Sequence, residues 1–128
     1  MLLNFPTAMA HGQGALLAGN AFAPKLALTA LAARAHLTCH SGFLIERLAQ
    51  ASDASKGVKH DAYDQKHRDV AELFAFVCPA QGAVPTVSGL GRALGLHVKN
   101  DAAGLEAVVA ELLRRLTDPR QPHLRPRE

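Results

Sequence analysis

The sequence predicts a small, helix-rich α/β domain in which helices pack against a short sheet. Its length of 128 residues suits one domain, which would bury roughly two thirds of the surface of the unfolded chain. Hydrophobic residues make up 48% and charged residues 20% of the chain, an ordinary globular balance. Segments with strand patterns and segments with helical periodicity also alternate along the chain, which is typical of α/β folds.

The first third of the chain is predicted to contain strands and one helix. Residues 1–20 are apolar and interrupted by glycines, so we expect one or two short strands joined by a tight turn. Residues 24–34 have apolar residues at helical spacing and a proline near the start, where a missing N–H costs least. At residues 36–40 apolar and polar residues alternate, which favours another strand.

The middle of the chain is predicted to contain two helices separated by a loop. Ser41 is expected to cap a helix over residues 42–51. Its apolar face would comprise Phe43, Leu44 and Leu48. Residues 51–66 are polar and without clear periodicity, and we expect them to form a surface loop. Residues 69–78 return to helical periodicity and indicate the best-defined helix, which Pro79 ends.

Two more helices are predicted before the C-terminal tail. Thr86 is expected to cap a helix over residues 87–94, and Gly95 suits the left-handed position after its end. Either Asn100 or Asp101 is expected to cap the last helix. Its apolar face would comprise Leu105, Val108, Val109, Leu112, Leu113 and Leu116.

The positive charge is concentrated at the C-terminal end. Residues 114–128 contain five arginines and two acidic residues, which accounts for the whole net charge of +3. We therefore expect a single domain over residues 1–117 and a proline- and arginine-rich tail or linker over residues 118–128. Contact with DNA phosphates would then depend on these arginines. They are Arg114, Arg115, Arg120, Arg125 and Arg127.

No motif in the sequence predicts catalytic, metal-binding or cofactor-binding residues. The chain has no phosphate-binding loop that ends in Lys and Ser or Thr. His36 and His40 would share one face of a strand, but no third metal ligand is identified. A nucleophile at Cys39 or Ser41 would need a base held in place by a third group. Core packing is the simpler interpretation of Cys39.

The two cysteines and the hydropathy pattern predict a cytoplasmic protein. Cys39 and Cys78 lie in apolar surroundings, and we expect them to be reduced, buried thiols. The apolar stretches are interrupted by charged residues well before the roughly 20 residues that a membrane-spanning helix needs. We therefore expect no contact with a membrane.

One block of sequence resembles a known family. Residues 69–96 read DVAELFAFVCPAQGAVPTVSGLGRALGL, and residues 39–48 read CHSGFLIERL. These segments resemble the N-terminal accessory region of alphaproteobacterial DinG-type DNA helicases, in which D-x-x-E-L-F-A-F-V is followed by P-T-x-x-G-L and A-L-G-L. The similarity extends, in a consistent order, over residues 36–116.

The resemblance implies a decayed proofreading exonuclease of the ribonuclease H-like fold. Such enzymes hold two metal ions with carboxylates on the first strand, a further Asp, and a His and Asp near the last helix. Asp69, His97 and Asp101 lie near the matching positions of this chain. No Asp or Glu precedes Glu46, so the first-strand carboxylates are absent and a working nuclease is not expected. Asp69 is expected to start a helix, His97 to lie in a loop, and Asp101 to be a helix cap.

Two functional hypotheses follow from these features. The first is a non-catalytic accessory domain of an ATP-dependent DNA helicase in DNA repair and unwinding, which helps to engage nucleic acid or docks on a motor in cis or in trans. This chain would then be a fragment or a truncated gene product. The alternative is a free-standing interaction protein that keeps the fold without chemistry and binds a protein or another copy of itself. Its basis is the apolar helix pair at residues 24–34 and 101–116.

Overall fold

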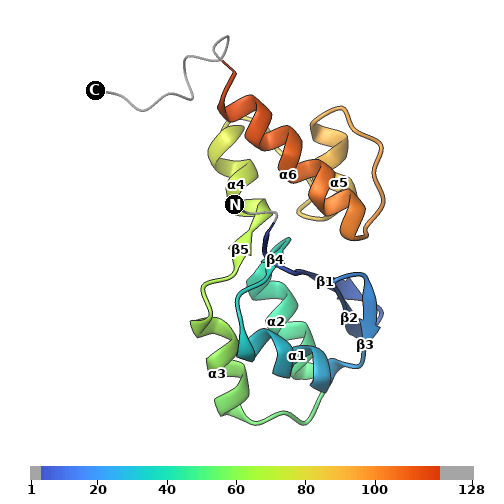
Figure 1. The fold of residues 1–128 in the computed structure, drawn as a ribbon, viewed down its shortest axis with the longest axis vertical. Coiled ribbons are helices and arrows are strands. Elements are labelled where there is room, and N and C mark those ends of the chain that lie inside the picture. The colour runs from blue at the N-terminus through green and yellow to red at the C-terminus, as the bar shows by residue number, and fades with distance from the viewer. Residues whose placement is uncertain (1–3, 119–128) are drawn as a thin grey trace, which may run out of the picture.

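The protein is a helix-rich α/β domain, as the sequence predicts, and its described residues form one five-stranded sheet. The computed structural model describes residues 4–118 (Figure 1). The strands are β1 (Thr7–His11), β2 (Gly14–Leu17), β3 (Asn20–Phe22), β4 (Leu37–Thr38) and β5 (Arg68–Asp69). The helices are α1 (Pro24–Ala33), α2 (Ser41–Gln50), α3 (Lys56–Asp64), α4 (Val70–Val77), α5 (Val87–Ala93) and α6 (Ala102–Leu116).

The sheet is mixed, with β1 at its centre. The strand order is β3-β2-β1-β4-β5, in which β2 is antiparallel to β1 and β3, whereas β4 is parallel to both β1 and β5. The predicted hairpin within residues 1–20 is confirmed, with Gly12 at a φ of 58° in its turn. Parallel pairing places the carboxyl ends of β1, β4 and β5 at the same edge of the sheet.

Two hydrophobic cores lie on opposite faces of the sheet. Successive residues of a strand point to opposite faces, so Ala8 joins one core and Met9 the other. The first core packs α1, α2 and α3 around Leu28, Leu31 and Leu44. The second core packs α4, α5 and α6, and its large buried residues include Phe74, Leu90, Leu105 and Leu112. Figure 1 shows these helix groups in the lower and upper halves of the molecule.

Three of the predicted helices are confirmed, and so are the caps predicted for two of them, Thr86 and Asp101. The side chains of Asp69, Thr86 and Asp101 each accept a hydrogen bond from a backbone N–H in the first turn of α4, α5 and α6. Gly95 follows α5 with a φ of 80°, the left-handed conformation that glycine adopts most readily. None of the helices within residues 4–118 combines the length and the apolar character required to cross a bilayer.

The structure corrects the prediction of a loop at residues 51–66. A helix, α3, occupies most of this segment, and the Ser55 side chain caps it by accepting a hydrogen bond from the Val58 N–H. Only Ala62 is fully buried in α3, at the contact with the core beneath α1. With a single buried position, the helix has no clear apolar stripe, so its periodicity was too weak to predict it.

The start of α2 also differs from the prediction. His40, not Ser41, is its cap, with a left-handed φ of 64° and a side chain that accepts a hydrogen bond from the Phe43 N–H. Ser41 is already the first helical residue. Leu44 is buried as expected, but Phe43 is 55% exposed. The strand predicted at residues 36–40 is shortened accordingly to β4.

A pair of histidines supports the edge where β4 and β5 meet. The backbone N–H of His36 donates to Nδ1 of His67 at 2.9 Å, and Nε2 of His67 lies 2.9 Å from the Ala62 carbonyl oxygen. Nδ1 must therefore be unprotonated, and Nε2 carries the proton that it donates to Ala62. Burial lowers the pKa of both His36 and His67. The fold thus favours their neutral forms.

We predict that stability falls as the pH drops below about 6.5, the ordinary histidine pKa. The folded pKa values of His36 and His67 lie below that value, so the unfolded chain takes up protons first. Their contribution is complete above pH 6.5 and is lost as the pH falls through the folded pKa values. Urea unfolding at a series of pH values measures this change. His67→Asn should flatten the profile, and the exposed-site control His11→Asn should not; equal slopes in both variants would contradict the prediction.

We predict that Thr38→Val leaves stability unchanged or raises it by up to about 1 kcal/mol. The Thr38 side chain is fully buried in β4, and within the described chain its hydroxyl oxygen has no hydrogen-bond partner. A methyl group of the same shape removes the cost of burying that hydroxyl. The same substitution at the cap Thr86 should instead destabilise the domain by about 1 kcal/mol. Thermal and urea unfolding compare the two variants. A clearly destabilised Thr38→Val protein would show that the Thr38 hydroxyl does form a stabilising hydrogen bond.

Candidate functional site

A cleft lies at the carboxyl ends of the parallel strands β1 and β4. It encloses about 390 Å³ between α2, the end of β1 and the segment before α5. Its lining residues are Met9, Ala10, Cys39, His40, Phe43, Arg47, Val84, Pro85, Thr86, Val87 and Asn100. In α/β sheets the carboxyl ends of parallel strands are the usual position of ligand sites. This cleft is therefore the first candidate for a functional site.

The polar side chains of the cleft are cationic or neutral. Arg47 is exposed on α2, and its Nη2 atom donates to the carbonyl oxygen of Gly12 in the β1–β2 turn. Asn100 is exposed on the opposite wall. The ring of Phe43 packs edge-on against His40, with centroids 5.7 Å apart. Within residues 4–118, no carboxylate lines this cleft.

The carboxylate of Asp69 lies behind the cleft wall and is bound to backbone and hydroxyl donors. Its Oδ1 atom accepts from the N–H groups of His40 and Ala71, both at 2.9 Å. Its Oδ2 atom accepts from the N–H of Ser41 at 2.8 Å and from the Ser41 hydroxyl at 3.2 Å. A carboxylate has about four lone-pair positions, and these four bonds occupy them. Asp69 is therefore a structural residue, as its predicted place at a helix start suggested.

Cys39 is not prepared to act as a nucleophile. Burial and the nearby Asp69 carboxylate raise its pKa to about 12, so the thiol stays protonated near neutral pH. The Sγ atom lies 3.6 Å from the Pro85 carbonyl oxygen, to which it donates, and Cys39 packs against the core of α4–α6. Within the described chain Cys39 and Cys78 form no disulfide.

The histidines considered as metal ligands do not converge. The Nδ1 atom of His36 contacts the Arg34 carbonyl oxygen at 2.8 Å, whereas His40 caps α2. His97 is exposed in the loop before α6, and Asp101 caps that helix through the Gly104 N–H at 2.7 Å. No group of three potential metal-ligating side chains occurs in the portion of the chain that the structure describes.

Two of the five arginines predicted to contact DNA are engaged in ion pairs on α6. Arg114 and Arg115 both bind the carboxylate of Glu111, at 2.7 and 2.8 Å. Their hydrogen bonds, with Arg114 contributing most, lower the pKa of Glu111 to about 2. Arg115 also donates to the Leu94 carbonyl oxygen. The other three, Arg120, Arg125 and Arg127, lie outside the described residues.

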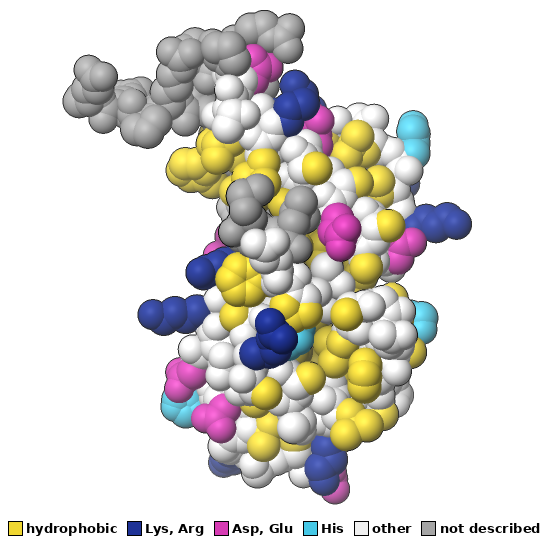
Figure 2. Space-filling view, in the orientation of Figure 1, with side chains coloured by type: hydrophobic (Ala, Val, Ile, Leu, Met, Phe, Trp, Pro, Cys, Tyr) yellow, Lys and Arg dark blue, Asp and Glu magenta, His cyan; other side chains and the backbone are white. Residues whose placement is uncertain are grey.

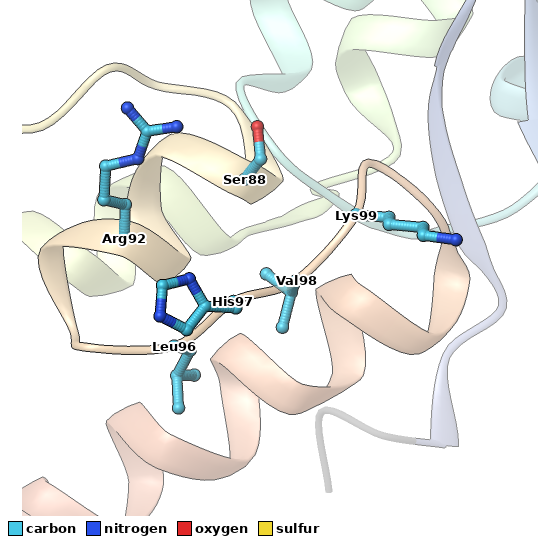
Figure 3. Close-up of a pocket in the computed structure, with 6 residues that line it drawn as sticks. All are labelled: Ser88, Arg92, Leu96, His97, Val98 and Lys99. Atoms are coloured by element: carbon cyan, nitrogen blue, oxygen red, sulfur yellow. The ribbon is translucent and has the colours of Figure 1, made fainter.

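A second pocket lies between α5 and the loop that precedes α6 (Figure 3). It has a volume of about 280 Å³ and is lined by Ser88, Arg92, Leu96, His97, Val98 and Lys99. Arg92 and His97 lie at one end, and Lys99 extends away from them at the other end. Gly104 allows α6 to approach this loop, because a Cβ atom there would collide with the Lys99 carbonyl oxygen. Close backbone packing therefore holds the basic loop in place.

The sequence analysis missed the basic residues of both pockets. Arg47 follows Glu46 in the sequence, so the two opposite charges cancel in the net charge of that segment. The second pocket could have been predicted from a stretch of sequence that contains no acidic residue. No Asp or Glu occurs between Glu72 and Asp101, although that stretch contains Arg92 and Lys99. On the face shown in Figure 2, acidic and basic side chains are interspersed.

We predict that Asp69→Ala destabilises the domain by about 2–4 kcal/mol. The substitution removes the cap of α4 and leaves the N–H groups of His40 and Ser41 without their acceptor. Glu72→Ala is the matched control, because Glu72 is an exposed carboxylate in the first turn of the same helix. Glu72→Ala should lower the free energy of unfolding by about 0.5 kcal/mol. Urea unfolding measures both, and equal losses would show that Asp69 has no special structural role.

Residues 69–96 contain several of these structural positions. Asp69 caps α4, Thr86 caps α5, and Gly95 occupies the turn after α5. Phe74 and Leu90 pack in the core of α4–α6. In comparisons of the chain with known proteins, no family model, no curated protein and no solved structure matches it.

Proposed function

We propose that this chain is a non-catalytic accessory domain of an ATP-dependent DNA helicase, acting in DNA unwinding and repair. It would help to engage nucleic acid or would dock on a motor domain, in cis or in trans, in the cytoplasm. The cleft at the carboxyl ends of β1 and β4 carries this proposal. Arg47, His40 and Asn100 supply its polar groups, and the nearby Asp69 carboxylate is fully hydrogen-bonded. The site suits anion binding better than metal-dependent cleavage.

The topology supports the resemblance on which the proposal draws. The order β3-β2-β1-β4-β5, with β2 alone antiparallel to its neighbours, is compatible with the ribonuclease H-like fold that the resemblance implies. The residues shared with the DinG-type pattern include helix caps and core positions, which maintain a fold rather than perform a reaction. A non-catalytic accessory domain needs residues that maintain its fold, and it does not need catalytic residues.

The charge balance at β1 is the reason to expect no nuclease chemistry. Two divalent cations need several carboxylates to hold them and to offset their charge. The strand β1 reads Thr-Ala-Met-Ala-His and contains none. Met9 stands in the cleft, and His11 is exposed at the strand end. The residues present can bind a phosphate oxygen through Arg47 but cannot assemble a two-metal centre.

One observation favours the alternative of a free-standing interaction protein. Phe76 on α4 is 64% exposed, and Leu26 on α1 is 63% exposed. The stripes of α1 and α6 are otherwise core, because Leu28, Leu31 and Leu112 are fully buried. A second copy or another protein could cover the exposed side chains. Light scattering tests this alternative, because a dimer that Phe76→Ser dissociates would favour it.

We predict that the chain binds single-stranded DNA and leaves it intact. Incubation of a labelled oligonucleotide with Mg²⁺ or Mn²⁺ should give no cleavage products, whereas a mobility shift should be seen at low salt and lost at high salt. Metal-dependent cleavage that Asp69→Asn abolishes would overturn the proposal.

Sequencing the gene beyond the codon for Glu128 tests the link to a motor domain in cis. Such a motor must contain a phosphate-binding G-x-x-x-x-G-K-[ST] loop.

A further inference from the structure

The cleft and the second pocket are adjacent. Thr86 and Val87 line the cleft, and the next residue, Ser88, lines the second pocket. Likewise, Asn100 lines the cleft, and its neighbour Lys99 lines the second pocket. The Asn100 Oδ1 atom accepts a hydrogen bond from the Ser88 N–H at 2.9 Å and joins the two walls. The two hollows therefore follow one another across the start of α5 and the loop before α6.

This combined surface presents basic side chains that no ion pair neutralises. Arg47, Arg92 and Lys99 are all exposed and form no ion pair with any residue between 4 and 118. Lys25, Lys59, Arg114 and Arg115 are paired with carboxylates, whereas Arg34, Lys56, Lys66 and Arg68 also form no ion pair within residues 4–118. Among residues 4–118, no acidic side chain lines either hollow. The surface is therefore a local region of positive charge on a body that is neutral overall.

The carboxylates of Asp101 and Asp69 do not cancel this charge by direct contact. Asp101 follows Asn100, but its Oδ1 atom accepts from the Gly104 N–H at the start of α6. Asp69 lies behind His40 and is fully hydrogen-bonded to the starts of α2 and α4. Arg47, Arg92 and Lys99 remain available to an anion from solvent.

An aromatic ring stands at the cleft end of the basic surface. Phe43 is 55% exposed and lines the cleft together with Arg47, one turn further along α2. The edge contact with His40 orients its ring. Cationic groups along a groove and an exposed aromatic ring form the usual combination for single-stranded nucleic acid, because phosphates bind the cations and an unpaired base stacks on the ring.

We propose that one segment of single-stranded nucleic acid follows this surface, with phosphates at Arg92, Lys99 and Arg47 and a base stacked on Phe43. The proposal rests on the function proposed above and names the ligand and its path. A base paired in a duplex cannot offer its face to Phe43, so the single strand is preferred over the duplex. An acidic peptide would use the cations but would gain little from the ring. The site lies in the body of the domain, not in the arginine-rich tail.

Fluorescence anisotropy with a labelled oligothymidine measures the affinity over a range of salt concentrations. The double variant Arg92→Ala/Lys99→Ala should bind at least about tenfold more weakly, and the salt slope should fall by about 1.4 for two lost phosphate contacts. Phe43→Ala should also lose about tenfold in affinity, from the lost stacking, with the salt slope unchanged. All three side chains are exposed, and circular dichroism with urea unfolding verifies that each variant is folded.

The matched control removes the same charges elsewhere. Arg34 and Lys56 are exposed and line neither hollow, so Arg34→Ala/Lys56→Ala should change the affinity less than twofold. A chain that ends at residue 118 should retain the effects of the Arg92, Lys99 and Phe43 variants, since the path does not include the tail.

The outcomes separate the path from the function. If the wild-type chain binds the oligonucleotide and the Arg92/Lys99 variant binds equally well, the path is wrong and the proposed function stands. Binding lost only on removal of the tail would likewise refute the path and leave the function standing. If polyglutamate of matched charge displaces the oligonucleotide and Phe43→Ala has no effect, the surface is a peptide site and the proposal fails. A wild-type chain that binds no nucleic acid refutes the path and the nucleic-acid function together.

Discussion

The hydrogen bonds of the Asp69 carboxylate hold together the two halves of the domain. Asp69 ends β5, caps α4 on one face of the sheet, and binds the start of α2, which packs on the other face. A single side chain thus joins both helical layers to the edge where the parallel strands end. The cleft depends on this junction, because Cys39, His40 and Phe43 are placed by the turn that Asp69 anchors. A mobile turn there would leave the cleft without a wall.

The same arrangement determines which chemistry the edge can support. A carboxylate that accepts four hydrogen bonds has no lone-pair position left for a metal ion, and β1 supplies no further carboxylate. Cys39 stays a thiol because it is buried beside that negative charge. What remains at the surface of this edge is a cation, an amide and an aromatic ring, which suit reversible contact with an anionic ligand.

The elements that could be predicted from the sequence are those whose signals are local. Thr86 and Gly95 mark the ends of α5, and the apolar stripe of α6 begins just after its cap, Asp101. Where the controlling interaction is distant in sequence, prediction failed. Ser41 was expected to be a cap, but Asp69 binds its hydroxyl and leaves the cap position to His40. The helix α3 is polar along most of its length and depends on tertiary packing at Ala62, which periodicity does not reveal.

The candidate site was less predictable than the fold because its charge is set by pairing and not by composition. Residues 114–128 account for the whole net charge, so residues 1–113 sum to zero and offer no sign of a basic surface. In the folded domain, however, the carboxylates form ion pairs with some of the basic side chains and not with others. Glu111 takes both Arg114 and Arg115, whereas Arg92 and Lys99 fall in a stretch without acidic residues. Residues 1–113 therefore sum to zero although they contain basic side chains without ion pairs at α5 and the loop that follows it. Only the folded structure brings these side chains beside Arg47 and Phe43.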